Sequence, residues 1–226
     1  MSKKTEVKRI FDAISKRYDF LNHFLSAGID FYWRKKALKL SQINSETILL
    51  DVACGTGDFS LAAKKMGVQQ VTGADLSKNM LSVFAKKDES QKGKLVQTEA
   101  EILPFKKNIF TNITIAFGVR NFHNIPLAFS SFYDTLKENG KVTILEFSLP
   151  KSFLIKKLYM FYFTRLLPWF GKIVSKDKSA YTYLPESVKE FEEKINLPDL
   201  LVEAGFSDVK LTKLTFGIVQ VVVAKK

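Results

Sequence analysis

The chain has 226 residues, of which 46% are hydrophobic and 26% are charged, and its formal net charge is +12. This length suits one domain with a full core, and the composition excludes an intrinsically disordered chain. The excess of positive charge predicts attraction to an anionic partner, either nucleic acid or the acidic surface of a membrane.

The only cysteine, Cys54, excludes an intramolecular disulfide and is typical of a reducing compartment. The two histidines, His23 and His123, lie far apart and have no cysteine or histidine partner at ligand spacing, so we expect no metal. The first residues carry charges without an apolar segment behind them, which argues against a secretory signal. We therefore expect a cytoplasmic protein.

Residues 1–45 contain an aromatic-rich helical stretch that precedes the first predicted strand. We expect this segment to be a helical cap over the substrate side of a single domain that covers residues 1–226. Tyr18, Asp19 and His23 lie in the cap and are candidates for orienting or deprotonating a substrate. An imidazole exchanges protons near neutral pH. The alternative is that His23 is a packing residue, which is the commoner role of a lone histidine among aromatic side chains.

Apolar runs of strand length alternate with helix-length segments from residue 48 onward, which predicts a parallel sheet. The predicted strands are 48–52, 71–74, 94–98, 109–117 and 141–147, and the predicted helices are 60–66, 77–87 and 126–137. The last helix has Pro126 in its first turn and Asn139-Gly140 as its stop signal. A short helix near 198–205 precedes two strands, 209–214 and 218–224, whose short link requires an antiparallel hairpin.

The segment Asp51-Val52-Ala53-Cys54-Gly55-Thr56-Gly57-Asp58 follows the first strand, and the second strand ends at Asp75. A strand that enters a Gly-x-Gly turn and opens into a helix, with an acid about 20 residues later, is typical of a nucleotide-cofactor site. Asp51 and Asp58 would repel a dinucleotide pyrophosphate but attract a sulfonium. We therefore predict S-adenosylmethionine (SAM) as the cofactor; the alternative is an ordinary turn that binds nothing.

Residues 150–196 form a predicted helical insert between the fifth strand and the hairpin. No acidic residue occurs between Phe147 and Lys176. In this part, lysine and arginine residues stand between and beside three runs of aromatic and aliphatic residues. No uncharged run reaches the roughly 18 residues that a spanning helix needs. The insert is expected either to lie on a membrane surface or to be a lid helix packed over a hydrophobic pocket.

Several blocks of the sequence resemble the UbiE/MenG family of quinone C-methyltransferases. The blocks are Tyr18-Asp19-Phe20-Leu21-Asn22, Gly28-Ile29-Asp30, Trp33-Arg34, Asp51 to Asp58, Leu103-Pro104-Phe105, Phe117-Gly118-Val119-Arg120-Asn121, Leu145-Glu146-Phe147-Ser148-Leu149-Pro150, Tyr181 to Ser187 and Ala204-Gly205-Phe206. The Phe-Gly-x-Arg-Asn and Glu-Phe-Ser-x-Pro blocks are far more specific than a Gly-x-Gly turn. The resemblance implies an α/β, Rossmann-like class I methyltransferase fold, with a mostly parallel seven-stranded sheet and a C-terminal antiparallel hairpin.

The resemblance also implies positions for the cofactor. Thr56 and the glycines Gly55 and Gly57 belong to the cofactor loop, Asp75 takes the ribose hydroxyls, and Glu99-Ala100 lie beside the adenine. Two positions depart from the family pattern: Glu99 replaces the usual Asn or Asp, and Ala116 replaces the usual Ser before Phe-Gly. Backbone groups can bind the cofactor at both positions.

The implied activity is methylation of a prenylated quinol ring, mainly of demethylmenaquinol and secondarily of a ubiquinone precursor. Arg120, just after the fourth strand, is the candidate for stabilising the phenolate that forms, and a structural ion pair is its alternative role. The expected partners are the quinol and, transiently, the inner surface of the bacterial plasma membrane, with no nucleic acid; a homodimer is left open.

Two other functions are alternatives to this one. A nucleic-acid methyltransferase would suit the positive charge, but the chain has Ala116 to Asn121 where adenine N6 enzymes carry Asp/Asn-Pro-Pro-aromatic. Cytosine C5 enzymes need a cysteine nucleophile, whereas Cys54 lies in the cofactor loop. The intact set of Asp51, Gly55, Gly57 and Asp75 disfavours a non-catalytic partner with the same fold.

Overall fold

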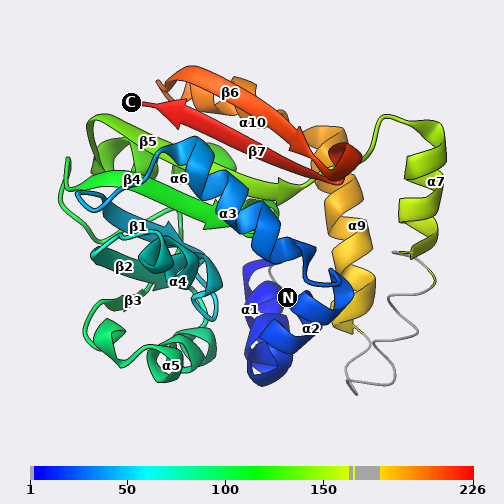
Figure 1. Ribbon diagram of the computed structural model, residues 1–226, viewed down its shortest axis with the longest axis horizontal. Coiled ribbons are helices and arrows are strands. Elements are labelled where there is room, and N and C mark those ends of the chain that lie inside the picture. Colours follow the sequence, from blue (N-terminus) through cyan, green and yellow to red (C-terminus); the bar gives the residue numbers. More distant parts are fainter. Residues whose placement is uncertain (1–2, 163–164, 166–178) are drawn as a thin grey trace.

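A computed structural model describes residues 3–162, 165 and 179–226 (Figure 1). Most of the middle of the predicted insert, including Trp169, Lys172 and Lys176, lies outside the described residues, as does the side chain of Tyr181.

Seven strands form one sheet in the order β3-β2-β1-β4-β5-β7-β6. The strands are β1 Ile48–Val52, β2 Gln70–Asp75, β3 Leu95–Gln97, β4 Phe110–Ala116, β5 Leu136–Phe147, β6 Ser207–Leu214 and β7 Val219–Lys225. Strands β1 to β5 run parallel, whereas β7 pairs antiparallel with both β5 and β6. The predicted parallel sheet with a C-terminal antiparallel hairpin is therefore confirmed.

The described residues form nine α-helices and four 3-10 turns, and side chains cap the starts of two of the α-helices. The α-helices are α1 Lys3–Ile14, α2 Tyr18–Leu25, α3 Ile29–Ser41, α4 Asp58–Lys65, α5 Lys78–Lys87, α6 Ile125–Thr135, α7 Phe153–Phe161, α9 Ser179–Lys194 and α10 Leu197–Glu203. The 3-10 turns are η1 Ser15–Arg17, η2 Glu89–Gln91, η3 Val119–Asn121 and η5 Thr215–Gly217. Ser77 caps α5 by accepting a bond from the Met80 N–H, and Asn124 caps α6 in the same way.

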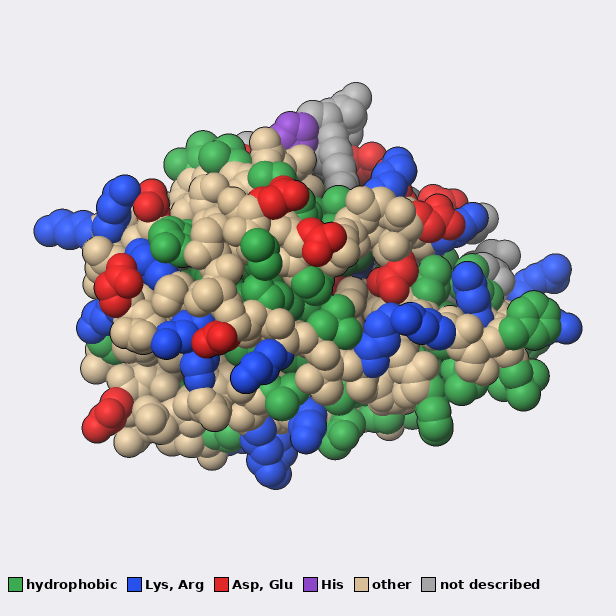
Figure 2. All heavy atoms as spheres, turned by 90° about the horizontal axis from the view of Figure 1, so that it is seen from above, with side chains coloured by type: hydrophobic (Ala, Val, Ile, Leu, Met, Phe, Trp, Pro, Cys, Tyr) green, Lys and Arg blue, Asp and Glu red, His purple; other side chains and the backbone are tan. Residues whose placement is uncertain are grey.

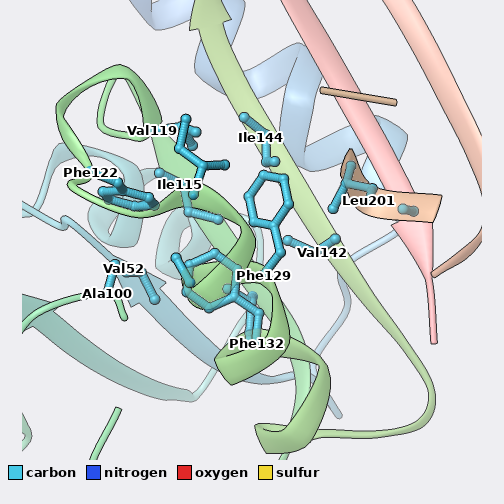
Figure 3. Packing of buried hydrophobic residues seen from close by; sticks show 14 of the residues in the cluster. Val52, Ala100, Ile115, Val119, Phe122, Phe129, Phe132, Val142, Ile144 and Leu201 are labelled. Atoms are coloured by element: carbon cyan, nitrogen blue, oxygen red, sulfur yellow. The ribbon is translucent and has the colours of Figure 1, made fainter. Parts of the chain in front are cut away.

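Both faces of the sheet are covered, because successive strand residues point to opposite sides. Leu50 and Val52 of β1 belong to the cluster that contains Phe129 and Phe132 of α6 (Figure 3). Leu49, the residue before Leu50, belongs instead to the cluster formed with α3 and α4. Because both faces of these strands are buried, their sequences are nearly continuous runs of apolar residues.

The end of α6 differs from the sequence prediction. The helix ends at Thr135, whose hydroxyl donates to the Ser131 carbonyl, and β5 begins at the next residue. Asn139-Gly140 lies inside β5, where the pairing with β4 shifts register, instead of ending the helix. Glycine is needed there because a Cβ would lie 2.7 Å from the Lys137 carbonyl oxygen. The Asn-Gly signal therefore marks an irregularity of the strand.

The helices outside the sheet core gather at one end of the molecule. Figure 1 shows α1, α2 and α9 beside the end of the sheet to which β4 and β5 point, with α7 at the far side of α9. The carboxyl ends of parallel strands are the edge at which such folds bind their ligands. The predicted N-terminal helical segment thus lies at that edge.

Candidate active site

The turn after β1 needs an unusual backbone. Ala53, Gly55 and Gly57 have φ angles of 51°, 54° and 88°, a region that favours glycine. A Cβ on Gly57 would lie 2.1 Å from Cδ2 of Phe84, which packs from α5 against this turn. Gly57 is therefore required both by its backbone angle and by the close approach of Phe84.

Asp75 holds the turn from the end of the neighbouring strand. Its carboxylate accepts the Gly55 N–H and the Ser77 N–H, both at 2.8 Å. Burial raises the pKa of Asp75 to about 6, although these two hydrogen bonds oppose the shift. Each carboxylate oxygen has two lone pairs, so Asp75 can still accept hydrogen bonds from two hydroxyl groups of a ligand.

A cavity, here called the cofactor cavity, opens beside Gly55 and Asp75. Glu99, Ala100 and Ala116, which the sequence predicts to contact the cofactor, also line it. Apolar side chains complete the wall, among them Leu76, Met80 and Phe122. An acceptor-only carboxylate next to an apolar slot suits a ribose and an adenine, and Gly55 allows a close backbone approach. The residues present therefore fit SAM.

The two acids that flank the glycine turn do not line this cavity. Asp51 is buried and accepts hydrogen bonds from Ser60 Oγ at 2.6 Å and Thr114 Oγ1 at 3.0 Å. Asp58 forms an ion pair with Lys87, with 2.7 Å between Nζ and Oδ1. Asp51 and Asp58 are therefore not placed to contact a sulfonium in this cavity, contrary to the expectation from the sequence; the carboxylates in the cavity wall are those of Asp75, Glu99 and Glu101.

Thr56 and Gly57 also lie behind the cavity wall and shape the turn. The Thr56 hydroxyl donates to Asp19 of α2, and Lys87 of α5 contacts the other oxygen of Asp19 at 2.5 Å. Asp12 of α1 accepts from Ser77 Oγ, also at 2.5 Å. Asp19 therefore joins the N-terminal helices to the cofactor turn and is not part of the cofactor cavity wall.

A second cavity adjoins the first and shares Phe11, Tyr18 and Phe117 with it. It lies among α1, α2, α3 and α7, and its volume is about 260 Å³ against about 100 Å³ for the cofactor cavity. Its wall is mainly apolar and aromatic. Tyr18 stands at the junction, where burial raises the pKa of its hydroxyl, opposed by the hydrogen bond of Asn22 and by the charges of Arg120 and Arg34.

Arg120 lines the second cavity and is paired at the same time. Its NH1 group donates at 2.6 Å to both Glu146 Oε1 and the Phe117 carbonyl oxygen. Glu146 is fully buried and also accepts the Phe147 N–H. Arg120 therefore forms the ion pair that was its alternative role and also lines the second cavity, while its role toward a phenolate stays a prediction.

His23 lies outside both cavities. Its Nδ1 is 2.8 Å from Asp30 Oδ2, its Nε2 is 3.4 Å from Asp58 Oδ2, and its ring stacks on Phe31. Asp30 and Arg34, for which the sequence alone indicated no role, both line the second cavity. Their spacing of four residues on one helix was the available signal, because it suits an ion pair on one helix face.

No group of three or more metal-ligating side chains occurs among the described residues. The mostly parallel sheet, its antiparallel last strand and the cofactor cavity at its carboxyl edge define a class I SAM-dependent methyltransferase. Solved structures agree on the fold: a SAM-dependent methyltransferase of Thermotoga maritima superposes with a TM-score of 0.67 at 20% identity, covering 96% of this chain and 99% of that one. A SAM-dependent methyltransferase of Aquifex aeolicus gives 0.60 at 17% identity, covering 85% and 88%.

The chain belongs to the ubiE/COQ5 methyltransferase family, whose sequence profile matches residues 1–226. It is 38% identical to a demethylmenaquinone methyltransferase of Bacteroides fragilis over 229 aligned residues, covering 99% of this chain and 94% of that protein. It is 39% identical to the enzyme of that name from Staphylococcus aureus, covering 95% and 90%. The chain is therefore an enzyme that uses SAM, and the nucleic-acid alternative finds no support.

Proposed function

We propose that this enzyme methylates a ring carbon of demethylmenaquinol, a prenylated quinol, in menaquinone synthesis. The observation that carries the proposal is the second cavity, which is apolar and aromatic and adjoins the cofactor cavity at Tyr18 and Phe117. A flat aromatic ring suits such a wall. The relatives named demethylmenaquinone methyltransferase, which match over nearly the whole chain, support the same substrate.

When bound, SAM supplies an electrophilic methyl group. Gly55 and Asp75 would hold its sugar, and Glu99, Ala100 and Ala116 would surround its base. Tyr18, at the junction of the two cavities, orients the quinol ring. Holding two reactants in line is a large part of the catalysis that such a reaction needs.

Arg120 stabilises negative charge on the quinol oxygen next to the methylated carbon. Loss of a phenolic proton makes the ring electron-rich, and a buried guanidinium favours the phenolate that results. Glu146 keeps the Arg120 side chain in place through the 2.6 Å ion pair. The apolar wall keeps water away, which strengthens this electrostatic effect.

Helix α7 supports a peripheral contact with the membrane in which the quinol dissolves. Tyr159 is buried and lines the second cavity, whereas Phe153, Leu154, Leu158 and Phe161 on the opposite face are exposed. Lysines border the exposed face, and Figure 2 shows hydrophobic and basic side chains together at the end of the molecule that α7 occupies. An apolar face flanked by lysines suits the surface of an anionic bilayer.

No helix in the described ranges is long and apolar enough to cross a bilayer. The surface contact is tested with the double variant Leu154→Ser/Leu158→Ser, which should lose binding to vesicles that contain anionic lipid. Val202→Ser, an equally exposed change on α10, is the matched control. Equal vesicle binding by the double variant and the control would contradict the contact through α7.

The reaction is tested by incubating the purified enzyme with methyl-labelled SAM and one acceptor in each tube. Reduced demethylmenaquinone, the reduced benzoquinone precursor and transfer RNA are the three acceptors. Label is expected in the naphthoquinol. Label in none of the quinols would refute the proposed function, and label only in RNA would revive the nucleic-acid alternative.

A further inference from the structure

Two arginines, one from α3 and one from η3, line the second cavity in matching surroundings. The Arg34 guanidinium carbon is 5.7 Å from the centre of the Phe117 ring, and that of Arg120 is 5.5 Å from the centre of the Phe147 ring. The two rings pack together with 4.5 Å between their centres. All four residues line the cavity, so its wall carries a guanidinium at each end of an aromatic pair.

Each arginine has its own buried carboxylate. Arg120 pairs with Glu146, and Arg34 pairs with Asp30 four residues earlier on the same helix. Asp30 also accepts a hydrogen bond from Ser26 Oγ at 2.7 Å and lies 2.8 Å from His23 Nδ1. Burial tends to raise the pKa of Asp30, but the hydrogen bonds of Ser26 and Arg34 outweigh it and lower the pKa, so the pair is ionised at neutral pH.

Arg34 has donor capacity beyond this pair. Its side chain is 6% exposed, and among the described residues its Nε has no hydrogen-bond partner. Its NH2 group lies 3.9 Å from Asp58, which is longer than a hydrogen bond. A buried donor without a partner costs free energy that a ligand acceptor can recover. Because Arg34 lines the second cavity, a small shift of its guanidinium would bring a donor to an acceptor on a ligand in that cavity.

Resting on the proposed function, we propose that Arg34 binds the second oxygen of the quinol. A quinol ring carries two hydroxyl oxygens on opposite sides. Asn121, the last residue of the η3 turn that carries Arg120, lines the cofactor cavity, and on this ground we assign Arg120 to the oxygen beside the methylated carbon. Arg34 then donates to the distal oxygen. The guanidinium stays protonated and no bond forms or breaks at it, so Arg34 is a positioning residue that selects a ring with two oxygens.

The test compares two short acceptors that differ by one oxygen atom. The first is the naphthalenediol that carries one prenyl unit, and the second is the naphthol that lacks only the distal hydroxyl. Affinity is measured by titration calorimetry and methyl transfer by label, for the wild type, Arg34→Gln and Arg34→Lys. Removing the distal oxygen is expected to weaken binding at least about tenfold in the wild type. In Arg34→Gln, removing the distal oxygen should weaken binding hardly at all, because the substitution and the missing oxygen both remove the same hydrogen bond.

Two controls separate this role from a structural one. Lys35→Gln removes a positive charge from the neighbouring, exposed position of α3 and should keep the wild-type preference for two oxygens. The pair Asp30→Asn/Arg34→Gln is neutral and leaves no unpaired buried charge; it should fold, bind SAM as the wild type does and lack the preference.

The outcomes also separate this inference from the proposed function. If the wild type methylates neither acceptor nor demethylmenaquinol, the proposed function fails. Suppose instead that the wild type methylates the diol, and that removing the distal oxygen weakens binding to Arg34→Gln as much as binding to the wild type. Arg34 then does not bind that oxygen. This inference is overturned, while the proposed function stands. An equal loss of affinity for both acceptors in every Arg34 variant would likewise assign Arg34 a structural role only.

Discussion

The backbone N–H of Gly55 donates a 2.8 Å hydrogen bond to the carboxylate of Asp75, which joins the turn after β1 to the end of β2. The two residues lie 20 positions apart in the chain and meet because β1 and β2 are parallel neighbours. The acid therefore has two tasks: it fixes the glycine turn and it offers its remaining lone pairs to the cofactor cavity.

Asp75→Asn should weaken SAM binding about tenfold or more, since an amide group accepts at one atom only and carries no negative charge. Isothermal titration calorimetry measures the dissociation constant directly. The exposed acid Asp134, changed to Asn, is the control. Unchanged affinity in the Asp75 variant would mean that the cofactor binds elsewhere.

Asp51 should make stability depend on pH. Burial raises its pKa from 3.8 to about 6 in the folded state, despite the hydrogen bonds of Ser60 and Thr114. A raised folded pKa gives a contribution that is present below 3.8 and is lost as the pH rises through about 6. The stability of the wild type relative to Asp51→Asn should therefore fall between pH 4 and pH 7, by on the order of 2–3 kcal/mol. Urea unfolding at several pH values measures it, and a pH-independent difference would contradict the shift.

Gly57→Ala should destabilise the enzyme more than Gly67→Ala. Both glycines have positive φ angles, but a Cβ on Gly57 meets the Phe84 ring, whereas a Cβ on Gly67 meets nothing within 4 Å. Gly67→Ala should cost about 1 kcal/mol for backbone strain, and Gly57→Ala about 1–3 kcal/mol more for the clash. Urea midpoints of the two variants make the comparison; equal costs would show that Phe84 moves aside freely.

Asp19→Asn should loosen the N-terminal helices from the cofactor turn. The change removes the charge that Lys87 contacts at 2.5 Å and weakens the bond from Thr56. Backbone amides in α1 and α2 should then exchange hydrogen faster, because these helices open more often. Mass spectrometry of peptides from α1 and α2 measures this exchange rate, and Asp199→Asn on α10 is the control. If exchange is unchanged in α1 and α2, other contacts hold the cap.

Much of the fold could be predicted because local patterns decide it. Strand β1 has the predicted bounds, since an apolar run between polar segments marks a buried strand. The end of α6 could not be predicted, because Asn139-Gly140 carries the same signal after a helix and inside a bulged strand.

Part of the candidate site could also be predicted from the sequence, and part could not. Gly55 and Asp75 follow from a motif with fixed spacing. Asp51 and Asp58 have the right spacing too, but their surroundings depend on Thr114 and Lys87, which only the folded chain brings near. The second cavity depends on packing between α3, α7 and the end of β5, for which the sequence offers no periodic signal.

The quinol ring is proposed to be methylated where the two cavities meet. The most direct measurement is the quinone content of a bacterium that lacks its own demethylmenaquinone methyltransferase and expresses this enzyme, determined by mass spectrometry of extracted lipids. The wild type should convert the accumulated demethylmenaquinone to menaquinone, and Asp75→Asn expressed at the same level should convert far less. Persistence of demethylmenaquinone with folded, SAM-binding wild-type enzyme present would contradict the claim.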